Sequence, residues 1–298
     1  MKLGVLQALP PRVDELSPER LAHIRSMGFT GTGLPTSYSP EAITPDRARQ
    51  IGSMFADAGL DLVEYGRYHT NLVHPDAQVR RENIADLKAA VRVARAAGCM
   101  AVITGAGSRN PGNAWWPHPD NYSPETFERL VDSLREAVKP AEDEGVLLGL
   151  EGSTLTPLRN AQTTRDVLDA VGSPALRAHL DPVNWITWDT IFCTGQAVAS
   201  MFETLGPERM LSAHNKGVTA ENKVGVHISE TVTGAPDDIF DHAAILRVAS
   251  QMPSDFYLVI EHLSLEQMPA ARRHLLGIAE QIGVHIDGID GKVTERSC

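Results

Sequence analysis

Short apolar runs alternate with amphipathic segments along the chain. Residues 146–150 (VLLGL) and 258–260 (LVI) are continuously apolar instead of alternating with polar positions. Parallel strands covered by helices have this pattern, because neither face of the sheet meets water. Five amphipathic segments end at a glycine that an apolar run follows at once. Since glycine closes a helix in the left-handed conformation at little cost, each such position predicts a helix-to-strand junction. The five glycines are Gly28, Gly59, Gly98, Gly145 and Gly283.

Three helix starts carry a second local signal. Ser17, Thr44 and Ser123 each precede a proline and then an acidic residue. A capping hydroxyl, proline at the first helical position and an acid in the first turn are typical of helix N-termini. We therefore expect helices between the strands and a last helix near 264–282. The predicted strands lie near residues 2–8, 28–34, 60–66, 99–105, 146–151, 176–181, 210–214 and 255–261.

Eight strands that alternate with helices predict an α/β protein built as a single (β/α)8 TIM barrel. A chain of 298 residues has room for one such barrel of about 250 residues. We assign residues 1–286 to the barrel and residues 287–298 to a polar C-terminal tail. A doubly wound open sheet is the alternative, but no Gly-x-Gly-x-x-Gly follows the first predicted strand. Residues 109–124 and 216–238 are predicted to be long loops after strands, and such loops are usually functional.

The composition indicates which kinds of partner and which cellular compartment to expect. The net charge of −11 and the pI near 5.4 argue against nucleic acid, which is bound by clustered Lys and Arg. Cys99, Cys193 and Cys298 form no CxxC pair, as a reducing compartment permits. The N-terminus lacks a signal-peptide pattern, and no apolar run approaches the ~18 residues of a membrane span. We expect a cytoplasmic protein without a membrane or nucleic-acid partner, and the sequence leaves a homo-oligomer open.

Four residues that commonly bind metals stand at the C-terminal ends of four predicted strands. They are Glu151, Asp181, His214 and Glu261. In parallel α/β folds the carboxyl ends of strands carry function, whereas the amino ends serve packing. Three carboxylates and one imidazole suit one divalent cation, with Mn²⁺ as the first choice and Mg²⁺, Co²⁺, Fe²⁺ or Zn²⁺ as alternatives. The competing interpretation is a buried network of ion pairs.

The residues around these positions resemble a known superfamily. Glu151 ends the fifth predicted strand, and LDPVN, HNK and IEH mark the sixth, seventh and eighth. This pattern is similar to the sugar phosphate isomerase/epimerase superfamily, the xylose-isomerase-like barrels, over essentially the whole chain. The resemblance implies that the four residues bind one divalent metal ion and that Glu151 and Glu261 also act as the acid/base pair.

The resemblance implies a metal-dependent isomerase or epimerase that acts on a ketose or related polyol carbonyl compound. A coordinated carbonyl and hydroxyl would stabilise the enediolate left when a carboxylate removes a carbon-bound proton. Proton return to the other face gives epimerisation, and return to the neighbouring carbon gives isomerisation. Loss of a β-hydroxyl or an aglycone would make the enzyme a lyase, a dehydratase or deglycosidase acting on an oxidised sugar, glycoside or inosose. That lyase is the main alternative, and a barrel without catalytic activity is another.

Two departures from the family pattern bear on specificity. Asn184 stands three residues after Asp181, where the family often has a substrate-binding His. No Arg occurs between Arg209 and Arg247, although ketose 3-epimerases of the family carry one there, so Lys216 or Lys223 would have to anchor the substrate. A remote alternative is an endonuclease IV-like DNA-repair enzyme, but the extra His and Asp ligands of its trinuclear zinc site are missing.

Other polar and aromatic residues follow the predicted strands and are candidates for binding a small sugar substrate. Aromatic faces beside hydrogen-bonding groups suit a sugar-sized ligand, although loop packing would explain the tryptophans equally well. His179 shares strand parity with Asp181, so it should point into the barrel, either as a supporting donor or as a core histidine. By the same parity we interpret His262 as structural. The candidate substrate contacts are Tyr65, His69, Asn71, Trp115, Trp116, His179, Asn184 and Lys216.

Overall fold

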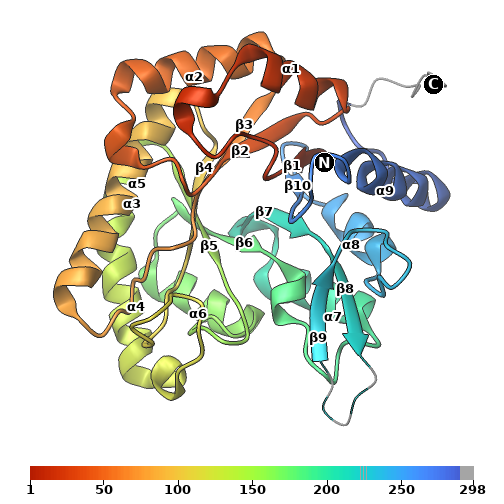
Figure 1. The fold of residues 1–298 in the computed structure, drawn as a ribbon. Helices are drawn as coiled ribbons and strands as arrows, with labels where there is room; N and C mark the ends of the chain where they lie inside the picture. The colour runs from red at the N-terminus through yellow and green to blue at the C-terminus, as the bar shows by residue number, and fades with distance from the viewer. Residues whose placement is uncertain (222, 224, 226, 289–298) are drawn as a thin grey trace.

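A closed barrel of eight parallel strands forms the centre of the molecule, and helices surround it (Figure 1). The computed structural model describes residues 1–221, 223, 225 and 227–288. Neighbouring strands follow the order β1-β10-β7-β6-β5-β4-β3-β2, which confirms the predicted (β/α)8 architecture. The barrel strands are β1 (Lys2–Val5), β2 (Gly31–Leu34), β3 (Asp61–Arg67), β4 (Ala101–Gly105), β5 (Leu147–Glu151), β6 (Leu176–Leu180), β7 (Met210–Asn215) and β10 (Tyr257–Ile260).

The helices begin and end where the local signals predict. Ser17, Thr44 and Ser123 each accept a hydrogen bond from the first turn of the helix that follows. All five predicted helix-ending glycines have positive φ, for example 68° at Gly98 and 66° at Gly145. The helices are α1 (Pro18–Ser26), α2 (Pro45–Asp57), α3 (Ala77–Ala97), α4 (Pro124–Ala137), α5 (Lys139–Glu144), α6 (Ala161–Val171), α7 (Thr194–Leu205), α8 (His242–Ala249) and α9 (Met268–Ile282).

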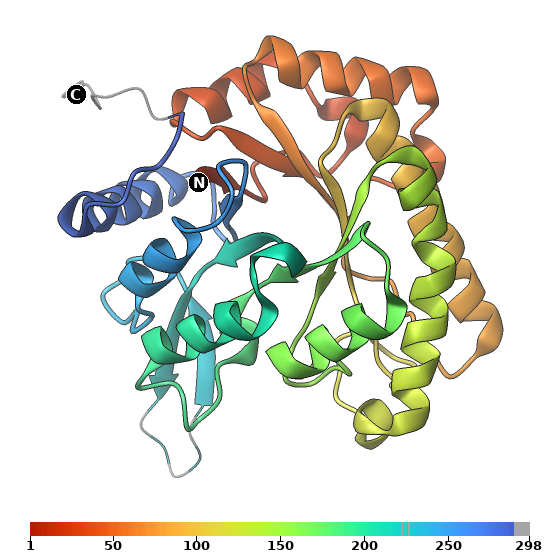
Figure 2. The same ribbon diagram turned by 180° about the vertical axis from the view of Figure 1, so that it is seen from behind.

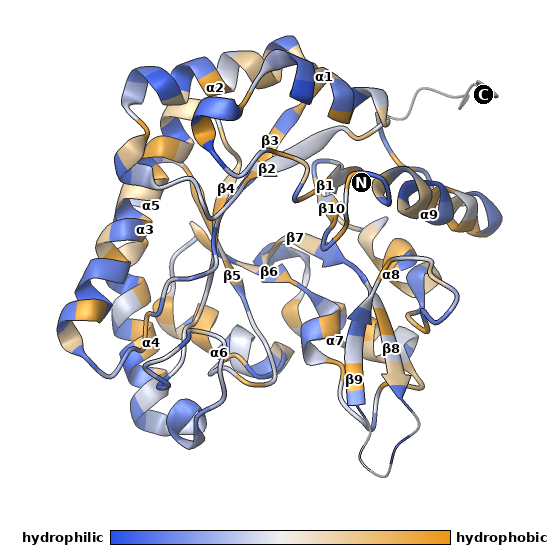
Figure 3. Cartoon of the chain, viewed as in Figure 1, coloured by the Kyte–Doolittle hydropathy of each residue, from blue (hydrophilic) through white to orange (hydrophobic). Residues whose placement is uncertain are grey.

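The main hydrophobic core lies between the barrel and its helices. The helices carry hydrophobic and hydrophilic residues side by side (Figure 3), as helices do when one face packs on a sheet and the other meets solvent. None of the helices in the described ranges is long and apolar enough to cross a membrane. Inside the barrel, small apolar clusters centred on Tyr257 and Ile103 fill the space, and buried polar residues such as Glu64, His179 and His214 accompany them.

The two ends of the described chain meet beside α9, as the view from behind also shows (Figure 2). The ammonium group of Met1 lies 2.9 Å from Asp287 Oδ2, and Lys2 pairs with Asp287 in a parallel bridge. Residues 289–298 of the predicted polar tail lie outside the described residues.

A two-stranded antiparallel hairpin occupies part of the segment 216–238, which the sequence analysis assigned to a loop. Its strands are β8 (Gly217–Glu221) and β9 (His227–Thr231). β9 has no buried residue, so it lacks the apolar run by which the barrel strands were found. Asp238 fixes the base of the hairpin, since its Oδ1 accepts hydrogen bonds from the N–H groups of Val218 and Phe240.

Gly149 of β5 offers a test of packing inside the barrel. A Cβ there would lie 2.4 Å from Ile103 Cδ1 and 3.0 Å from Leu211 Cδ2. We expect Gly149→Val to lower the free energy of unfolding by about 1 to 3 kcal/mol, the usual cost of overpacking, in urea titrations. The matched control is Gly277→Ala on α9, where an added Cβ meets nothing within 4 Å. This substitution should leave the free energy of unfolding equal or raise it slightly. Equal unfolding midpoints for Gly149→Val and the unsubstituted protein would contradict this packing.

Candidate active site

The four predicted ligand residues come together because their strands are neighbours in the barrel. β5, β6, β7 and β10 stand side by side, and Glu151, Asp181, His214 and Glu261 lie at or just after their C-terminal ends. Glu151, Asp181 and His214 each offer a ligand atom, and these atoms lie within 4.8 Å of one another. Glu261 Oε2 lies 3.2 Å from His214 Nδ1. All four side chains are buried, so the cluster can hold a metal ion.

The donor atoms fit a divalent cation. Glu151 Oε2 and both ring nitrogens of His214 are buried and make no hydrogen bond with any residue that the structure describes. Buried polar atoms without partners are costly, and a cation beside Glu151 and one nitrogen of His214 would offset part of this cost. A set of carboxylate oxygens with one imidazole nitrogen suits Mg²⁺, Mn²⁺, Co²⁺, Fe²⁺ or Zn²⁺.

Two of the carboxylates are held in place by neighbouring hydrogen bonds. Asp181 Oδ1 accepts from the N–H of Val183, 3.1 Å away, and so caps the short turn Pro182–Trp185. Asn184, which follows in this turn, donates from Nδ2 to Glu151 Oε1 at 2.7 Å. The Asp-Pro sequence thus fixes one carboxylate directly and a second one through Asn184.

Lys216 supplies positive charge to the cluster. Its side chain is only 2% exposed, and Nζ lies 2.7 Å from Asp181 Oδ2 and 3.1 Å from Glu261 Oε1. Nζ is also 2.5 Å from Glu230 Oε1 and donates to Asn184 Oδ1 at 3.1 Å. Burial by itself would lower the pKa of the Lys216 ammonium, but the three carboxylates raise it well above its ordinary value. Lys216 therefore stays charged.

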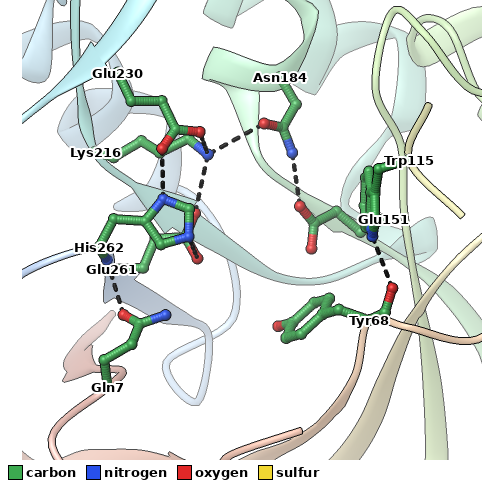
Figure 4. A pocket seen from close by; sticks show the side chains of 9 residues that line it. All are labelled: Gln7, Tyr68, Trp115, Glu151, Asn184, Lys216, Glu230, Glu261 and His262. Atoms are coloured by element: carbon green, nitrogen blue, oxygen red, sulfur yellow. Dashed lines mark hydrogen bonds and ion pairs between the residues drawn. The ribbon is translucent and has the colours of Figure 1, made fainter. Parts of the chain in front are cut away.

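The side chains line a pocket of about 320 Å³ at the carboxyl ends of the strands (Figure 4). Five of the predicted site residues line it: Glu151, Glu261, Trp115, Asn184 and Lys216. Trp115 donates from Nε1 to the carbonyl oxygen of Tyr68 at 2.7 Å and covers Gly105, where a Cβ would lie 2.9 Å from Trp115 Cζ2.

The remaining predicted contacts do not line this pocket. Tyr65 is fully buried, and its hydroxyl donates to the carbonyl oxygen of Tyr38. His69 Nε2 lies 3.2 Å from Arg67 Nη2, and the His69 side chain is half-exposed.

Asn71 joins two loops, since its Nδ2 donates to the carbonyl oxygen of Ser108 and its Oδ1 accepts from the Ser108 N–H. Trp116 is 54% exposed. His179 points into the barrel as its parity predicts, and its Nδ1 lies 2.8 Å from Ser212 Oγ.

Four residues that line the pocket were not among the predicted site residues: Gln7, Tyr68, Glu230 and His262. Glu230 reaches the pocket from β9 of the unpredicted hairpin. His262 has a φ of 58°, so the chain leaves the extended conformation directly after Glu261 and strand parity fails there. Its Nδ1 lies 2.5 Å from Glu230 Oε2, and its N–H donates to Gln7 Oε1 at 2.8 Å.

The surroundings of Glu151 and Glu261 shift their pKa values in opposite directions. Burial raises the pKa of Glu151 well above its ordinary value, and the nearby Asp181 and Glu261 carboxylates add to the effect. Burial would also raise the pKa of Glu261, but His214 and Lys216 outweigh it and hold this pKa well below the usual range. Two carboxyl groups with diverging pKa values are typical of an acid/base pair.

The chain belongs to the family of xylose isomerase-like TIM barrels, whose family model matches residues 21–278. No curated protein sequence gives a significant match. Similar solved structures include a xylose isomerase-like barrel protein from Mycobacterium smegmatis in complex with magnesium. The two chains are 16% identical with a TM-score of 0.71, and the match covers 94% of this chain and 97% of the other.

Two further solved structures carry the names of enzymes. The 3-keto-D-glucoside 4-epimerase from E. coli is 15% identical with a TM-score of 0.68, covering 94% of this chain and 99% of the other. The probable 3-DHS dehydratase involved in petrobactin synthesis from Bacillus anthracis is 15% identical with a TM-score of 0.69, and the match covers 93% of this chain and 99% of the other. At these identities the likeness establishes the fold.

Metal binding can be tested without a substrate. A ligand that binds only the folded state stabilises it, by about 2.7 kcal/mol when its concentration is one hundred times Kd. We expect Mn²⁺ to raise the Tm of the protein and EDTA to reverse the increase in thermal unfolding experiments. Asp181→Ala and His214→Ala should abolish the shift, whereas His69→Ala, outside the pocket, should keep it. An equal shift in all three variants would place the metal elsewhere.

Proposed function

We propose that this protein is a divalent-metal-dependent isomerase or epimerase of a ketose or related polyol carbonyl compound, with Glu151 and Glu261 as acid and base. The observation that carries the proposal is the buried convergence of Glu151, Asp181, His214 and Glu261 at the carboxyl ends of neighbouring strands, where Glu151 and Glu261 also line the pocket. Mn²⁺ remains our first choice of metal, and the family membership supports the class of reaction.

The two glutamates can act on opposite sides of a bound molecule. They approach the pocket from β5 and β10, with Lys216 and Asn184 between them (Figure 4). Asn184 holds Glu151 Oε1, which leaves Oε2 without a partner among the described residues. Lys216 lies 3.1 Å from Glu261 Oε1 and favours the ionised form of that carboxylate. A carboxylate fixed by one oxygen can accept or donate a proton through the other.

A divalent ion held by the four ligands would polarise a carbonyl and its neighbouring hydroxyl and so ease removal of the carbon-bound proton. The protein's own part is to orient the substrate and to keep water away. Trp115 and Tyr68 supply apolar walls to the pocket, and Lys216 and Asn184 offer hydrogen-bonding groups for substrate oxygens. His179 lies within β6, two residues before Asp181, and does not line the pocket.

The charges favour a substrate without a phosphate group. Among the described residues that line the pocket, Lys216 is the only Lys or Arg, and it lies beside the carboxylates Glu151, Glu230 and Glu261. Burial would raise the pKa of Glu230, but the hydrogen bond with His262 and the charge of Lys216 lower it to about 2. Glu230 is therefore ionised and offsets the positive charge of Lys216, which a phosphate would need.

A metal-dependent lyase is the second candidate, because a second hollow adjoins the pocket. It measures about 400 Å³, shares Asn184 and Glu230 with the first pocket, and includes the apolar side chains of Leu155, Trp188 and Ile228. Trp188 is 73% exposed, so its ring is free to cover a ligand. An apolar group attached to the sugar would fit there, and its loss after enolisation would be a β-elimination. A sugar without such a group would instead be epimerised or isomerised.

Substitution of the two glutamates tests their acid/base role. A screen of ketoses, 3-keto sugars and inososes in D₂O with Mn²⁺ would reveal enolisation by NMR as exchange of carbon-bound protons. We expect Glu151→Gln and Glu261→Gln to slow this exchange by about 10²- to 10⁴-fold, since an amide oxygen can face a metal but cannot accept the proton. His69→Ala is the control and should exchange at the unsubstituted rate. Full exchange in both glutamine variants would rule out the assignment.

The charge of the pocket leads to a prediction about specificity. We expect kcat/KM to favour a free sugar over its phosphate ester. A preference for the phosphate of ~100-fold, worth about 2.7 kcal/mol, would show that a phosphate site exists. Glu230→Gln should raise the relative kcat/KM of the phosphate ester by roughly tenfold, because it removes a like charge. Glu221→Gln on the exposed part of the same hairpin, paired with Lys223, should not change it.

A further inference from the structure

A shift of register in the barrel turns one more carboxylate inward. Thr32 of β2 pairs with Leu62, but the next residue, Gly33, pairs with Glu64, so Val63 of β3 is an extra residue. Val63 packs with Tyr257 and other apolar residues inside the barrel, and Glu64 directly after it also faces inward. Consecutive strand residues normally face opposite sides, and a β-bulge is the device that re-aims a side chain next to a site.

The surroundings hold Glu64 in one place. Its side chain packs against Gly33, where a Cβ would lie 2.7 Å from Glu64 Cγ, so only glycine leaves room for it. The hydroxyl of Tyr68 donates to Glu64 Oε1 at 2.6 Å. Glu64 is 1% exposed. Its other oxygen, Oε2, makes no hydrogen bond with the described residues and lies 3.5 Å from His214 Nε2.

The two nitrogens of His214 face different carboxylates. Nδ1 lies 3.2 Å from Glu261 Oε2, on the side of the ligand cluster, whereas Nε2 faces Glu64. A neutral imidazole carries its proton on one nitrogen and a lone pair on the other. A metal ligand has to present the lone pair, and ligating histidines almost always donate the other N–H to a carboxylate, carbonyl or water. Nε2 makes no hydrogen bond with any described residue, and the Glu64 carboxylate is the acceptor placed beside it.

We infer that Glu64 is a positioning residue for the metal centre: it accepts the Nε2 proton of His214 and thereby turns the Nδ1 lone pair toward Glu151, Asp181 and Glu261. The inference rests on the proposed metal-dependent function. The ring of His179 packs edge-on against His214 with the centroids 4.1 Å apart, but it offers no acceptor to Nε2 in the way that the Glu64 carboxylate does.

A second cation site is the competing explanation for these atoms. Glu64, His179 and His214 each offer one ligand atom, and these lie within 4.8 Å of one another. His179 Nε2 makes no hydrogen bond with the described residues. Such a site would require His214 to bind cations through both nitrogens, which a neutral imidazole does not provide. A hydrogen bond from Nε2 to Glu64 would need only the neutral ring.

The test compares Mn²⁺ affinity by calorimetry in the unsubstituted protein and in the Glu64→Leu and Glu64→Gln variants. Loss of such an outer partner typically weakens metal binding by about 10- to 100-fold, and we expect this for Glu64→Leu. The Mn²⁺ affinity of Glu64→Gln should lie between those of Glu64→Leu and the unsubstituted protein, because its amide oxygen can still accept the hydrogen bond. The control is Ser212→Ala, which removes the partner of His179 without touching a His214 nitrogen. The control should bind Mn²⁺ like the unsubstituted protein.

Two spectroscopic readouts separate positioning from a general loss of structure. ¹⁵N NMR of the Zn²⁺-loaded protein should show the His214 proton on Nε2. The visible spectrum of bound Co²⁺ should change in Glu64→Leu and not in Ser212→Ala. If Glu64→Leu does not fold, Glu64→Gln carries the comparison alone.

The outcomes distinguish this inference from the proposed function. Equal Mn²⁺ affinity in the Glu64 variants and the unsubstituted protein would overturn the role of Glu64 and leave the metal centre intact. If the unsubstituted protein binds two Mn²⁺ ions per chain and Glu64→Leu binds only one, Glu64 is a metal ligand. That result would also overturn the inferred positioning role. An unsubstituted protein that binds no Mn²⁺ would refute the proposed metal centre and this inference together.

Discussion

The concentration of negative charge at one end of the barrel governs the rest of the site. Glu151, Asp181 and Glu261 are all buried within the same cluster, where ionised carboxylates lose the stabilisation that water gives them. Such a group of charges persists only if cations or hydrogen-bond donors compensate it. Lys216 lies close to two of the three carboxylates, and His214 lies beside Glu261. The remaining donor atoms leave the cluster able to hold a further cation, so the negative charge that is costly to bury is also what suits the cluster to a metal ion.

The barrel is what allows these charges to be held together. Each candidate ligand stands at or just after the end of a strand that is hydrogen-bonded to its neighbours, so the closed sheet fixes the backbone from which its side chain projects. The hairpin β8–β9 is different, because it stands outside the barrel and reaches the pocket through Glu230. Glu230 pairs with both Lys216 and His262. The candidate metal ligands thus lie at the ends of barrel strands, whereas Glu230 enters the pocket from a hairpin outside the barrel.

The fold and the convergence of the four candidate ligands were predictable because their signals are local. Glycine at helix ends, capping hydroxyls and apolar runs each act within a few residues, and the strand ends follow from them. The missed pocket residues depend on features that break a regular period. His262 has a positive φ directly after a strand, and Glu230 lies in a hairpin without a buried residue on β9. Glu64 faces inward because Val63 is an extra residue in β3. Parity arguments fail at such positions, since one irregular residue reverses the side on which the next ones lie.

The reaction outcome depends less on the ligands than on what surrounds them. Proton removal by one glutamate is common to epimerisation, isomerisation and elimination, so the cluster itself does not discriminate between them. The outcome then depends on where the second proton goes and on whether a group is present that can leave. Asn184 lies on the boundary between the pocket and the apolar hollow beside it, because it lines both. It also donates a hydrogen bond to Glu151. Under the proposed function, a substrate that fills only the first pocket would meet both glutamates and could regain its proton, whereas one that extends past Asn184 would place its leaving group against Trp188. If the proposed function holds, the geometry of this boundary would decide whether the same metal centre serves an isomerase or a lyase.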